Sequence, residues 1–488
     1  MSENQKKLTA PARFDALNED ASRLSESIFY IVCSILVLSV AAFGAVDFWA
    51  LGFLSIFTGL IAVLWIADAW FKKEFRVNLN ALQIPLLGLI LIGLIQLLPL
   101  RNIEISGDLL SIPAVASLSL AAYSTRLMIV QLIIYLVFLV VADTFVNNQN
   151  RLRKIVVTII VFGSVMAFFG ILQRIANLEQ IYGLRQARQS VPFASYINQH
   201  HFAALMEMTV GITFALLFGN ATRNNKRVFL IIAVVIMGVA LVFTNSRGGM
   251  ISLLGVIGFI IAANIRQKTA AKTDSPDENT SNVRRALAFF SGGLVLILAL
   301  FGSVLMLGGD ESLLRGIGLG NHADVSSGRI HFWQTALLIF RDYPIFGVGL
   351  DAFGVAFTSY DTWNGTFRVE QAHNDYLQIL ADAGILGFGC VAAFIFLLFK
   401  QGWRTVAESS SQFRRATAIG ALAGCTGILI HSFFDFPLRT PGNAFFFLIL
   451  TVLATASIYQ PRLTRKKKKI TQINPASMLL LIQDKRKT

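Results

Sequence analysis

The chain has 488 residues, of which 55% are hydrophobic and 14% are charged. Water-soluble domains carry about 25% charged residues, so the composition excludes an ordinary soluble protein and favours an integral membrane protein. The formal net charge is +14, and the basic residues gather in the connectors between apolar runs, which is typical of cytoplasmic loops and argues against a nucleic-acid partner.

Twelve apolar runs follow one another along the chain, and a helix needs about 20 such residues to cross the hydrocarbon core of a bilayer. The first run begins after the polar residues 1–27 and is long enough to span, so we expect a retained helix and no cleaved signal peptide. The predicted fold class is an all-α polytopic membrane protein with about twelve transmembrane helices. The runs lie at about 28–46, 48–69, 81–99, 124–146, 154–176, 199–219, 227–243, 248–264, 286–308, 376–399, 415–433 and 442–459.

The runs divide the chain into a single membrane domain with two tails. A long connector separates the ninth run from the tenth, and it is too rich in aromatic residues to be wholly disordered. The expected segments are an N-terminal tail 1–27, nine helices within 28–308, the long loop 309–375, three helices within 376–459 and a basic tail 460–488.

The connectors between the runs alternate between two kinds. One kind, together with both tails, holds every lysine, and the other kind holds arginines and no lysine. The basic excess marks the first kind as cytoplasmic, so we expect both termini in the cytoplasm and the long loop on the opposite face of the membrane. Arginine pairs its planar guanidinium with two phosphate oxygens at once, so the arginine-only face suits a membrane-held phosphate; a chance drift of loop composition is the alternative.

In chain order, the first candidate site residues are Arg185 and Arg188, in the loop after the fifth run. They suit phosphate contacts, although a solvated basic loop has the same composition. The sixth run then begins with His200 and His201. Successive helix residues point in different directions, so this pair is a poor metal site, and neither a metal nor another cofactor is predicted. Glu207 lies deeper in the same run, where a carboxylate usually has a partner.

Arg247 lies in the tight turn 244–249 between the seventh and eighth runs. The two glycines that follow it let a ligand approach the backbone closely, and the next helix directs its N-terminus at an anion. For an arginine held between two helices at membrane depth, we favour a functional role. The alternative is a side chain that only extends to the lipid headgroups. The turn is therefore a candidate anion site.

The long loop is predicted to contain an amphipathic helix over 329–340, which would lie at the membrane interface. Serines suited to an N-cap precede it, and Tyr343-Pro344 ends it. His373 and Asn374 lie where the loop enters the tenth run. A helix N-terminus disfavours a protonated imidazole, so we expect a neutral His373 that takes a proton from an attacking hydroxyl; a histidine that only caps or packs is the alternative.

The last candidates, His431, Asp435 and Arg439, lie between the last two runs, where both a structural network and a catalytic site fit the sequence. The chain contains no phosphate-binding glycine loop of the ATPase type, no nucleophile elbow and no zinc-type spacing. ATP-driven and serine-hydrolase chemistry therefore have no support.

Together these segments resemble the O-antigen ligase family, which includes O-antigen polymerases and bacterial protein O-oligosaccharyltransferases. The resemblance rests on the order and spacing of five pieces, and the family domain would cover about residues 230–400. The pieces are Asn198-Gln199-His200-His201-Phe202-Ala203, Ser246-Arg247-Gly248-Gly249, Arg329 to Gly349, His373-Asn374 and His431-Ser432-Phe433-Phe434-Asp435.

The resemblance implies an inverting, metal-independent glycosyltransferase with a C-type membrane fold. Such an enzyme moves a glycan from undecaprenyl diphosphate to an acceptor hydroxyl on the periplasmic face. By similarity, Arg247 with one or both of Arg185 and Arg188 would hold the diphosphate, and His373 would activate the hydroxyl. Supporting positions would be taken by His201, Glu207, Arg329, Asn374, His431 and Asp435.

The leading hypothesis is an O-antigen ligase with a lipid A-core acceptor. A polymerase that uses a second lipid-linked glycan and a transferase that uses a protein hydroxyl are alternatives within the family. A transporter of lipid-linked glycan is the alternative from another class, and it predicts broken helices at the membrane midplane and paired repeats, neither of which is clear in the sequence.

Overall fold

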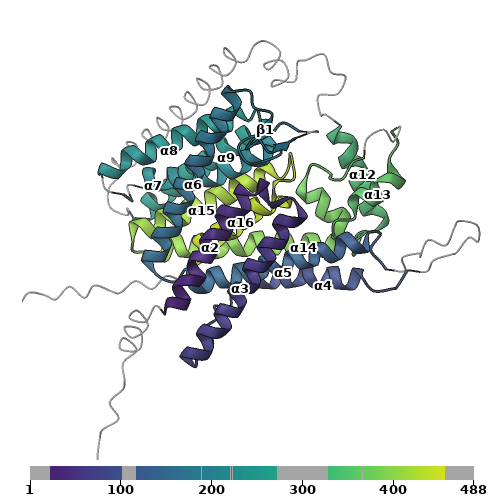
Figure 1. Ribbon diagram of the computed structural model, residues 1–488, viewed down its shortest axis with the longest axis horizontal. Coiled ribbons are helices and arrows are strands. Elements are labelled where there is room, and N and C mark those ends of the chain that lie inside the picture. Colours follow the sequence, from purple (N-terminus) through teal and green to yellow (C-terminus); the bar gives the residue numbers. More distant parts are fainter. Residues whose placement is uncertain are drawn as a thin grey trace, which may run out of the picture. The chain divides into compact units, whose positions relative to one another are not determined.

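The computed structural model describes residues 22–101, 117–187, 190–219, 221–222, 224–271, 328–363 and 368–456. These residues fold mostly as helices (Figure 1). The α-helices are α2 (Arg23–Ala41), α3 (Phe48–Lys72), α4 (Gln83–Gln96), α5 (Ala122–Phe145), α6 (Gln149–Ile175), α7 (Gln199–Phe218), α8 (Asn224–Phe243), α9 (Arg247–Ala271), α12 (Arg329–Asp342), α13 (Phe353–Tyr360), α14 (Asp375–Glu408), α15 (Gln412–His431) and α16 (Pro441–Thr455). The remaining elements are the 3-10 turns η1 (Phe43–Ala45) and η2 (Pro437–Arg439) and an antiparallel hairpin of β1 (Gln180–Ile181) and β2 (Arg185–Gln186).

Eleven of the predicted apolar runs coincide with a described helix, and the run 286–308 lies outside the described residues. Within the described ranges, nine helices are long and apolar enough to cross a membrane, whereas α4 and α16 have only 14 and 15 residues. The all-α polytopic class is therefore confirmed. The count of twelve spans, the C-type likeness and the orientation stay predictions.

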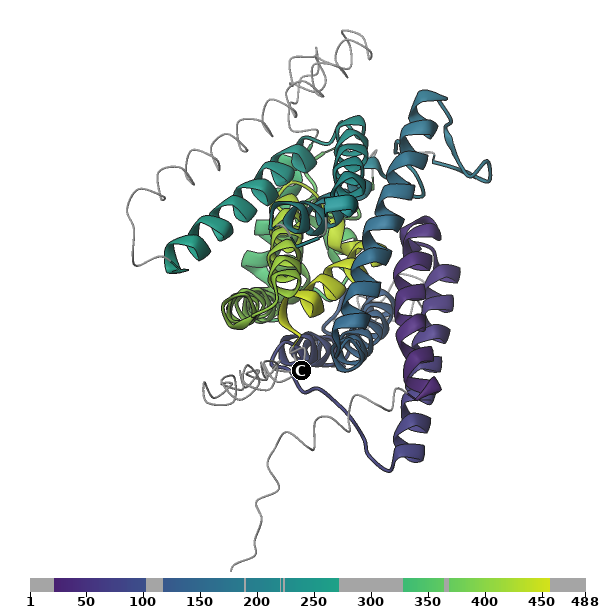
Figure 2. The same cartoon turned by 90° about the vertical axis from the view of Figure 1, so that its left-hand side faces the viewer.

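Helices α7 and α15 run antiparallel and pack against each other through glycines. A Cβ on Gly211 of α7 would lie 2.8 Å from the backbone nitrogen of Gly424 of α15. Small residues let membrane helices approach each other this closely. Helices α8, α9 and α16 pack around the pair, and Figure 2 shows the yellow C-terminal helices between purple N-terminal and teal segments. The first turns of α7 are thereby fixed against the last turn of α15.

Helix α16, the last of the described helices, is shorter than a bilayer-spanning helix and is buried at every residue. The buried side chain of Arg414 donates hydrogen bonds to the carbonyl oxygens of Leu453 and Ala456, both at 2.7 Å. These bonds satisfy carbonyls that a helix C-terminus leaves without partners. Because protein surrounds it, α16 does not need the length of a lipid-facing span.

Helix α14 is interrupted at Gly384, where the backbone has φ 62° and ψ −162°. The segment of the long loop that precedes α13 pairs with the backbone at this interruption. The N–H of Val348 donates to the carbonyl of Ala381 at 2.9 Å, and the N–H of Ile385 donates to the carbonyl of Pro344 at 2.8 Å. The polar groups freed by the break are therefore satisfied within the protein, as they must be at membrane depth.

This break corrects the sequence reading, which found no clearly interrupted helix. The apolar run continues for only 15 residues after the break, 385–399, which reach about 22 Å at 1.5 Å per residue, less than the roughly 30 Å of a hydrocarbon core. The nine residues of α14 before Gly384 are therefore needed to complete the crossing.

Two helices of the long loop, α12 and α13, form a small second core beside α14. Ile339 of α12 and Phe357 of α13 are buried in it. The predicted helix over 329–340 is confirmed as α12, although it continues to Asp342 and its N-cap residue is Gly328, with φ 83°, in place of a serine. Helix α13 was not predicted.

Candidate active site

Four helix ends meet at one end of the bundle: the N-termini of α7, α9 and α14 and the C-terminus of α15. The connector 431–440, which runs from the end of α15 to the start of α16, contacts each of the other three ends. The contacts are Asp435 with His373 (3.1 Å), Thr440 with His201 (2.7 Å), and the ring of His431 with Gly248.

His373 has a strained backbone directly before α14. Its φ of 50° lies in the left-handed region, which non-glycine residues rarely adopt and which is enriched at functional sites. Asn374 fixes this turn. Its Oδ1 accepts hydrogen bonds from the N–H groups of Tyr376 and Leu377, both at 3.0 Å, and its Nδ2 donates to the carbonyl of Phe433 at 3.1 Å. Asn374 therefore caps α14 and ties the position of His373 to the connector.

The imidazole of His373 is held by one hydrogen bond and two aromatic rings. Its Nδ1 lies 3.1 Å from Oδ1 of Asp435, and its ring centroid lies 5.9 Å from that of Phe332 and 4.8 Å from that of Phe436. An ionised carboxylate only accepts hydrogen bonds, so Nδ1 carries the hydrogen and the lone pair of the neutral ring is on Nε2. Nε2 has no hydrogen bond among the described residues, and the side chain is 32% exposed. A ligand can therefore reach it.

Asp435 is the buried charge beneath this histidine, with only 1% of the residue exposed. Burial by itself raises the pKa of a carboxyl group, but the hydrogen bond from His373 and the nearby imidazoles of His201 and His200 hold the pKa of Asp435 well below its usual range. Its Oδ1 also accepts a hydrogen bond from the N–H of Phe436 at 2.9 Å. Asp435 is therefore ionised and can orient the histidine.

Two arginines begin helices beside this centre. Arg329 is the first residue of α12, and its Nη2 lies 4.0 Å from Oδ2 of Asp435. Arg247 is the first residue of α9 and is exposed. Gly248, which follows it, lies so close to His431 that a Cβ would be 3.1 Å from Cδ2 of that ring. A helix N-terminus and a guanidinium at one place are both suited to an anion.

The partner of Glu207, which the sequence left open, is His431. Oε1 of Glu207 lies 2.7 Å from Nδ1 of His431, and both side chains are about 99% buried or more. A buried charge needs such a partner. The pair lies beneath the turn that carries Arg247, because Gly248 packs on the same imidazole.

The structure does not bring Arg185 into this centre. Arg185 forms an ion pair with Asp47 and lies over the ring of Phe43, with its guanidinium carbon 5.1 Å from the centroid. Among the described residues it has no hydrogen bond or ion pair with His373 or Asp435. Arg188 lies outside the described residues. A diphosphate role for either arginine stays a prediction.

Arg439 forms a buried network on the other side of the connector. It makes ion pairs with Asp351 of the long loop and with Asp382 of α14. Burial by itself lowers the pKa of a guanidinium, but the two carboxylates raise the pKa of Arg439. Asp382 also accepts a hydrogen bond from the N–H of Phe353 at 2.9 Å. This geometry fits the structural reading of Arg439.

Three residues of this centre were not among the site residues predicted from the sequence. Phe332 and Phe436 enclose the His373 ring, and Thr440 contacts His201. Aromatic residues in apolar segments are too common to single these out, and only the glycine and histidine spacing pointed to their neighbourhood. No group of three or more histidine, cysteine or acidic side chains arranged to hold a metal occurs within the ranges described.

Comparison with known proteins agrees with the sequence reading. No curated protein matches the chain significantly. The family described as O-antigen ligase matches residues 232–392, close to the predicted 230–400. This range contains Arg247, Arg329 and His373, and it ends before the connector that holds Asp435. Residues 232–392, about a third of the chain, are therefore similar to the O-antigen ligase family.

Proposed function

We propose that the chain is a glycosyltransferase that moves a glycan from undecaprenyl diphosphate to an acceptor hydroxyl, with His373 as the base. The observation that carries the proposal is the hydrogen bond between His373 and the buried, ionised Asp435. It leaves Nε2 as an accessible acceptor, which is the arrangement a general base needs. The match of residues 232–392 to the O-antigen ligase family supports glycosyl transfer in general terms.

The proposed reaction is a single displacement at the anomeric carbon. Nε2 of His373 takes the proton of the acceptor hydroxyl. The oxygen of that hydroxyl forms a bond to the anomeric carbon, and the bond between the anomeric carbon and the diphosphate oxygen breaks. The leaving diphosphate gains one negative charge, which Arg247 and Arg329 would stabilise. Asp435 would stabilise the imidazolium that forms. Attack opposite the leaving group inverts the anomeric configuration, and no step needs a metal.

An apolar groove supports a donor with a hydrocarbon chain. A cavity of about 200 Å³ between α4, α5, α14 and α15 is lined mainly by apolar side chains, with Asp375 and Arg439 among its polar lining residues. A second cavity of about 190 Å³ shares Tyr135 and Leu429 with it and is almost wholly apolar. Chains of lipid bind in such grooves by burial of apolar surface.

The test uses purified protein, undecaprenyl-diphosphate glycan and a lipid A-core acceptor. His373→Ala should lower kcat by about 10²–10⁴-fold, the usual range for a general base, and Arg247→Gln should lower kcat/KM. Arg341→Gln is the matched control, because Arg341 is exposed on α12 and, among the described residues, pairs only with its neighbour Asp342. Full activity of folded His373→Ala would refute the base assignment.

We favour a ligase that acts on lipid A-core at the periplasmic face of a bacterial inner membrane, with both termini in the cytoplasm. A polymerase would extend a second lipid-linked glycan in the same assay, and a protein transferase would label a protein acceptor. A transporter is less well supported. Helix α14 is interrupted at Gly384, but loop backbone occupies the break and takes its hydrogen bonds, so the break offers no open site for a transported substrate.

A further inference from the structure

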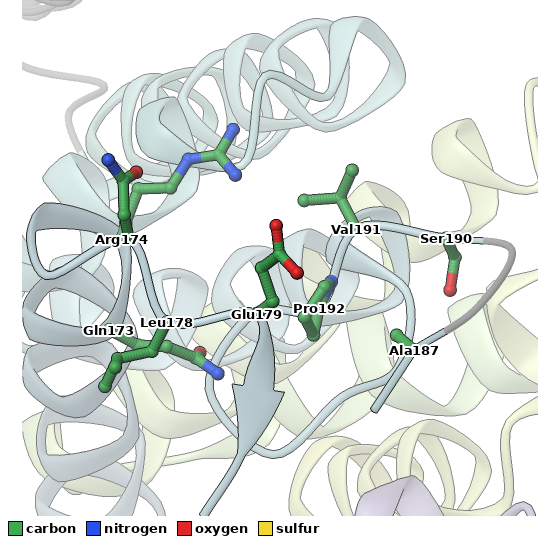
Figure 3. A pocket seen from close by; sticks show the side chains of 9 residues that line it. Gln173, Arg174, Leu178, Glu179, Ala187, Ser190, Val191 and Pro192 are labelled. Atoms are coloured by element: carbon green, nitrogen blue, oxygen red, sulfur yellow. The ribbon is translucent and has the colours of Figure 1, made fainter. Parts of the chain in front are cut away.

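A polar cavity of about 520 Å³ lies at the end of α6, in the loop that leads to α7 (Figure 3). It is separate from the His373 centre in its residues and is larger than the groove between α4 and α14. Five polar residues line it, with Leu178, Val191 and Pro192 as apolar walls. The polar residues are Gln173, Arg174, Asn177, Glu179 and Ser190.

Three polar groups of this cavity, on Arg174, Glu179 and Gln173, have no partner among the described residues. Within the described ranges, the guanidinium of Arg174 and the carboxylate of Glu179 have no hydrogen bond or ion pair, and Figure 3 shows both reaching into the same opening. Gln173 is 97% buried, and its Oε1 has no hydrogen-bond partner in the described part of the chain. A buried carbonyl oxygen without a partner costs free energy, so this wall of the cavity is incompletely satisfied.

The charges select the kind of ligand. Glu179 repels a simple anion and Arg174 repels a simple cation, whereas a neutral hydroxyl both donates and accepts and can satisfy both groups. The volume lies within the range of small-molecule sites. Val191 and Pro192 offer apolar surface to the C–H face of a sugar ring. The cavity therefore fits a sugar residue.

Two hydrogen bonds connect this cavity to the active centre through the start of α7. The N–H of Gln199 donates to the carbonyl of Val191 at 2.9 Å, and Ser190 donates to the carbonyl of Ile197 at 2.7 Å. The cap of α7, Asn198, accepts from the N–H of His200 at 2.9 Å. The cavity wall and the histidines of α7 are thus parts of one locally bonded segment.

We propose that this cavity is a glycan subsite that binds a neutral sugar residue at a distance from the bond being made. The inference rests on the proposed transfer reaction. The sugar belongs either to the donor glycan or to the acceptor glycan, and the two sources share the same recognition chemistry.

The test compares kinetics on two donors: lipid-linked glycan extracted from the cells that make the protein, and undecaprenyl-diphosphate monosaccharide. Glu179→Gln and Arg174→Gln should each raise one KM by about tenfold, which corresponds to about 1.4 kcal/mol, with kcat unchanged. A rise in the KM of the extracted donor alone assigns the cavity to the donor glycan. A rise in the KM of the acceptor alone assigns it to the acceptor.

The matched controls are Arg404→Gln and Glu408→Gln, an exposed ion pair at the far end of α14, which should leave every constant unchanged. Ser190→Ala is a milder variant in case the charge changes impair folding, and it should raise the same KM less. Unchanged KM values in folded variants, or a loss of kcat with all substrates alike, would overturn the subsite. If the unaltered protein shows no transfer at all, it is the proposed function that fails.

Discussion

Replacement of Asp435 by asparagine tests the central hydrogen bond with the least change in shape. In Asp435→Asn, the remaining Oδ1 can still accept from His373 and from the N–H of Phe436, which lie 3.1 and 2.9 Å away. What is lost is the negative charge that stabilises the imidazolium. Two unit charges 4 Å apart interact by about 4 kcal/mol at an effective dielectric of 20. Because a third of the His373 side chain is exposed, we take half of this, about 2 kcal/mol, which predicts a roughly 30-fold lower kcat.

Asp435→Ala removes the acceptor as well as the charge. The ring of His373 is then free to turn and to carry its hydrogen on the wrong nitrogen, so we expect a loss of about 10²–10⁴-fold, as for the histidine itself. The assay is the initial rate of transfer at saturating donor and acceptor, for protein whose melting temperature has been checked.

The control for this pair is Asp342→Asn on α12, which accepts from Tyr360 at 2.9 Å and is partly exposed; it should keep its activity. The expected order of kcat is unaltered protein, Asp435→Asn, then Asp435→Ala. Equal activity of Asp435→Asn and the unaltered protein would refute the charge argument, and equal loss in both variants would show that the charge alone matters and that the hydrogen-bond acceptor adds nothing.

Three further results are expected. Gly248→Ala should lower transfer activity, because its Cβ would press on the imidazole beneath it at 3.1 Å, whereas Gly258→Ala on the same helix meets nothing within 4 Å and should be neutral in the same assay. Gly384→Ala should lower the free energy of unfolding by at least about 1 kcal/mol, because a side chain there meets both a positive φ and the loop backbone. Gly389→Ala is the control, because its added Cβ meets nothing within 4 Å. An equal drop in the melting temperature of the two variants would contradict the reasoning. The stability that Asp435 contributes should be constant above about pH 5 and be lost as the pH falls below its ordinary pKa of about 3.9, because its pKa in the folded protein is depressed. The measurement is the difference in melting temperature between the unaltered protein and Asp435→Asn. A difference that changes between pH 6 and 8 would count against this reasoning.

The sequence predicts the helices well because lipid imposes a simple rule. Every backbone polar group must be satisfied inside the segment that crosses the bilayer, so apolar runs of sufficient length become helices. The rule fails where protein replaces lipid. α16 is short because other helices surround it, and the break at Gly384 is possible because loop backbone supplies the missing hydrogen bonds.

The sequence predicts candidate residues of the site, but it does not predict which of them contact one another. His373, Arg247 and Asp435 follow from helix ends, turns and family spacing, which are local features. The partners of Glu207 and Asp435 are separated from them by 224 and 62 residues, and no local pattern encodes such contacts. For the same reason, Arg329 was given a minor part and Arg185 a major one.

The pairing of the loop backbone with α14 has a consequence for how this protein can vary and move. The segment before α13 is bonded to α14 on both sides of Gly384, through Val348 and Ile385, so a swing of the whole loop away from the bundle would break those bonds together. Along the chain, Arg329 lies before the paired loop segment 344–349 and His373 lies after it. Their spacing is thereby set by the backbone pairing between loop and helix, and an insertion within 344–349 or within 381–385 should disrupt it.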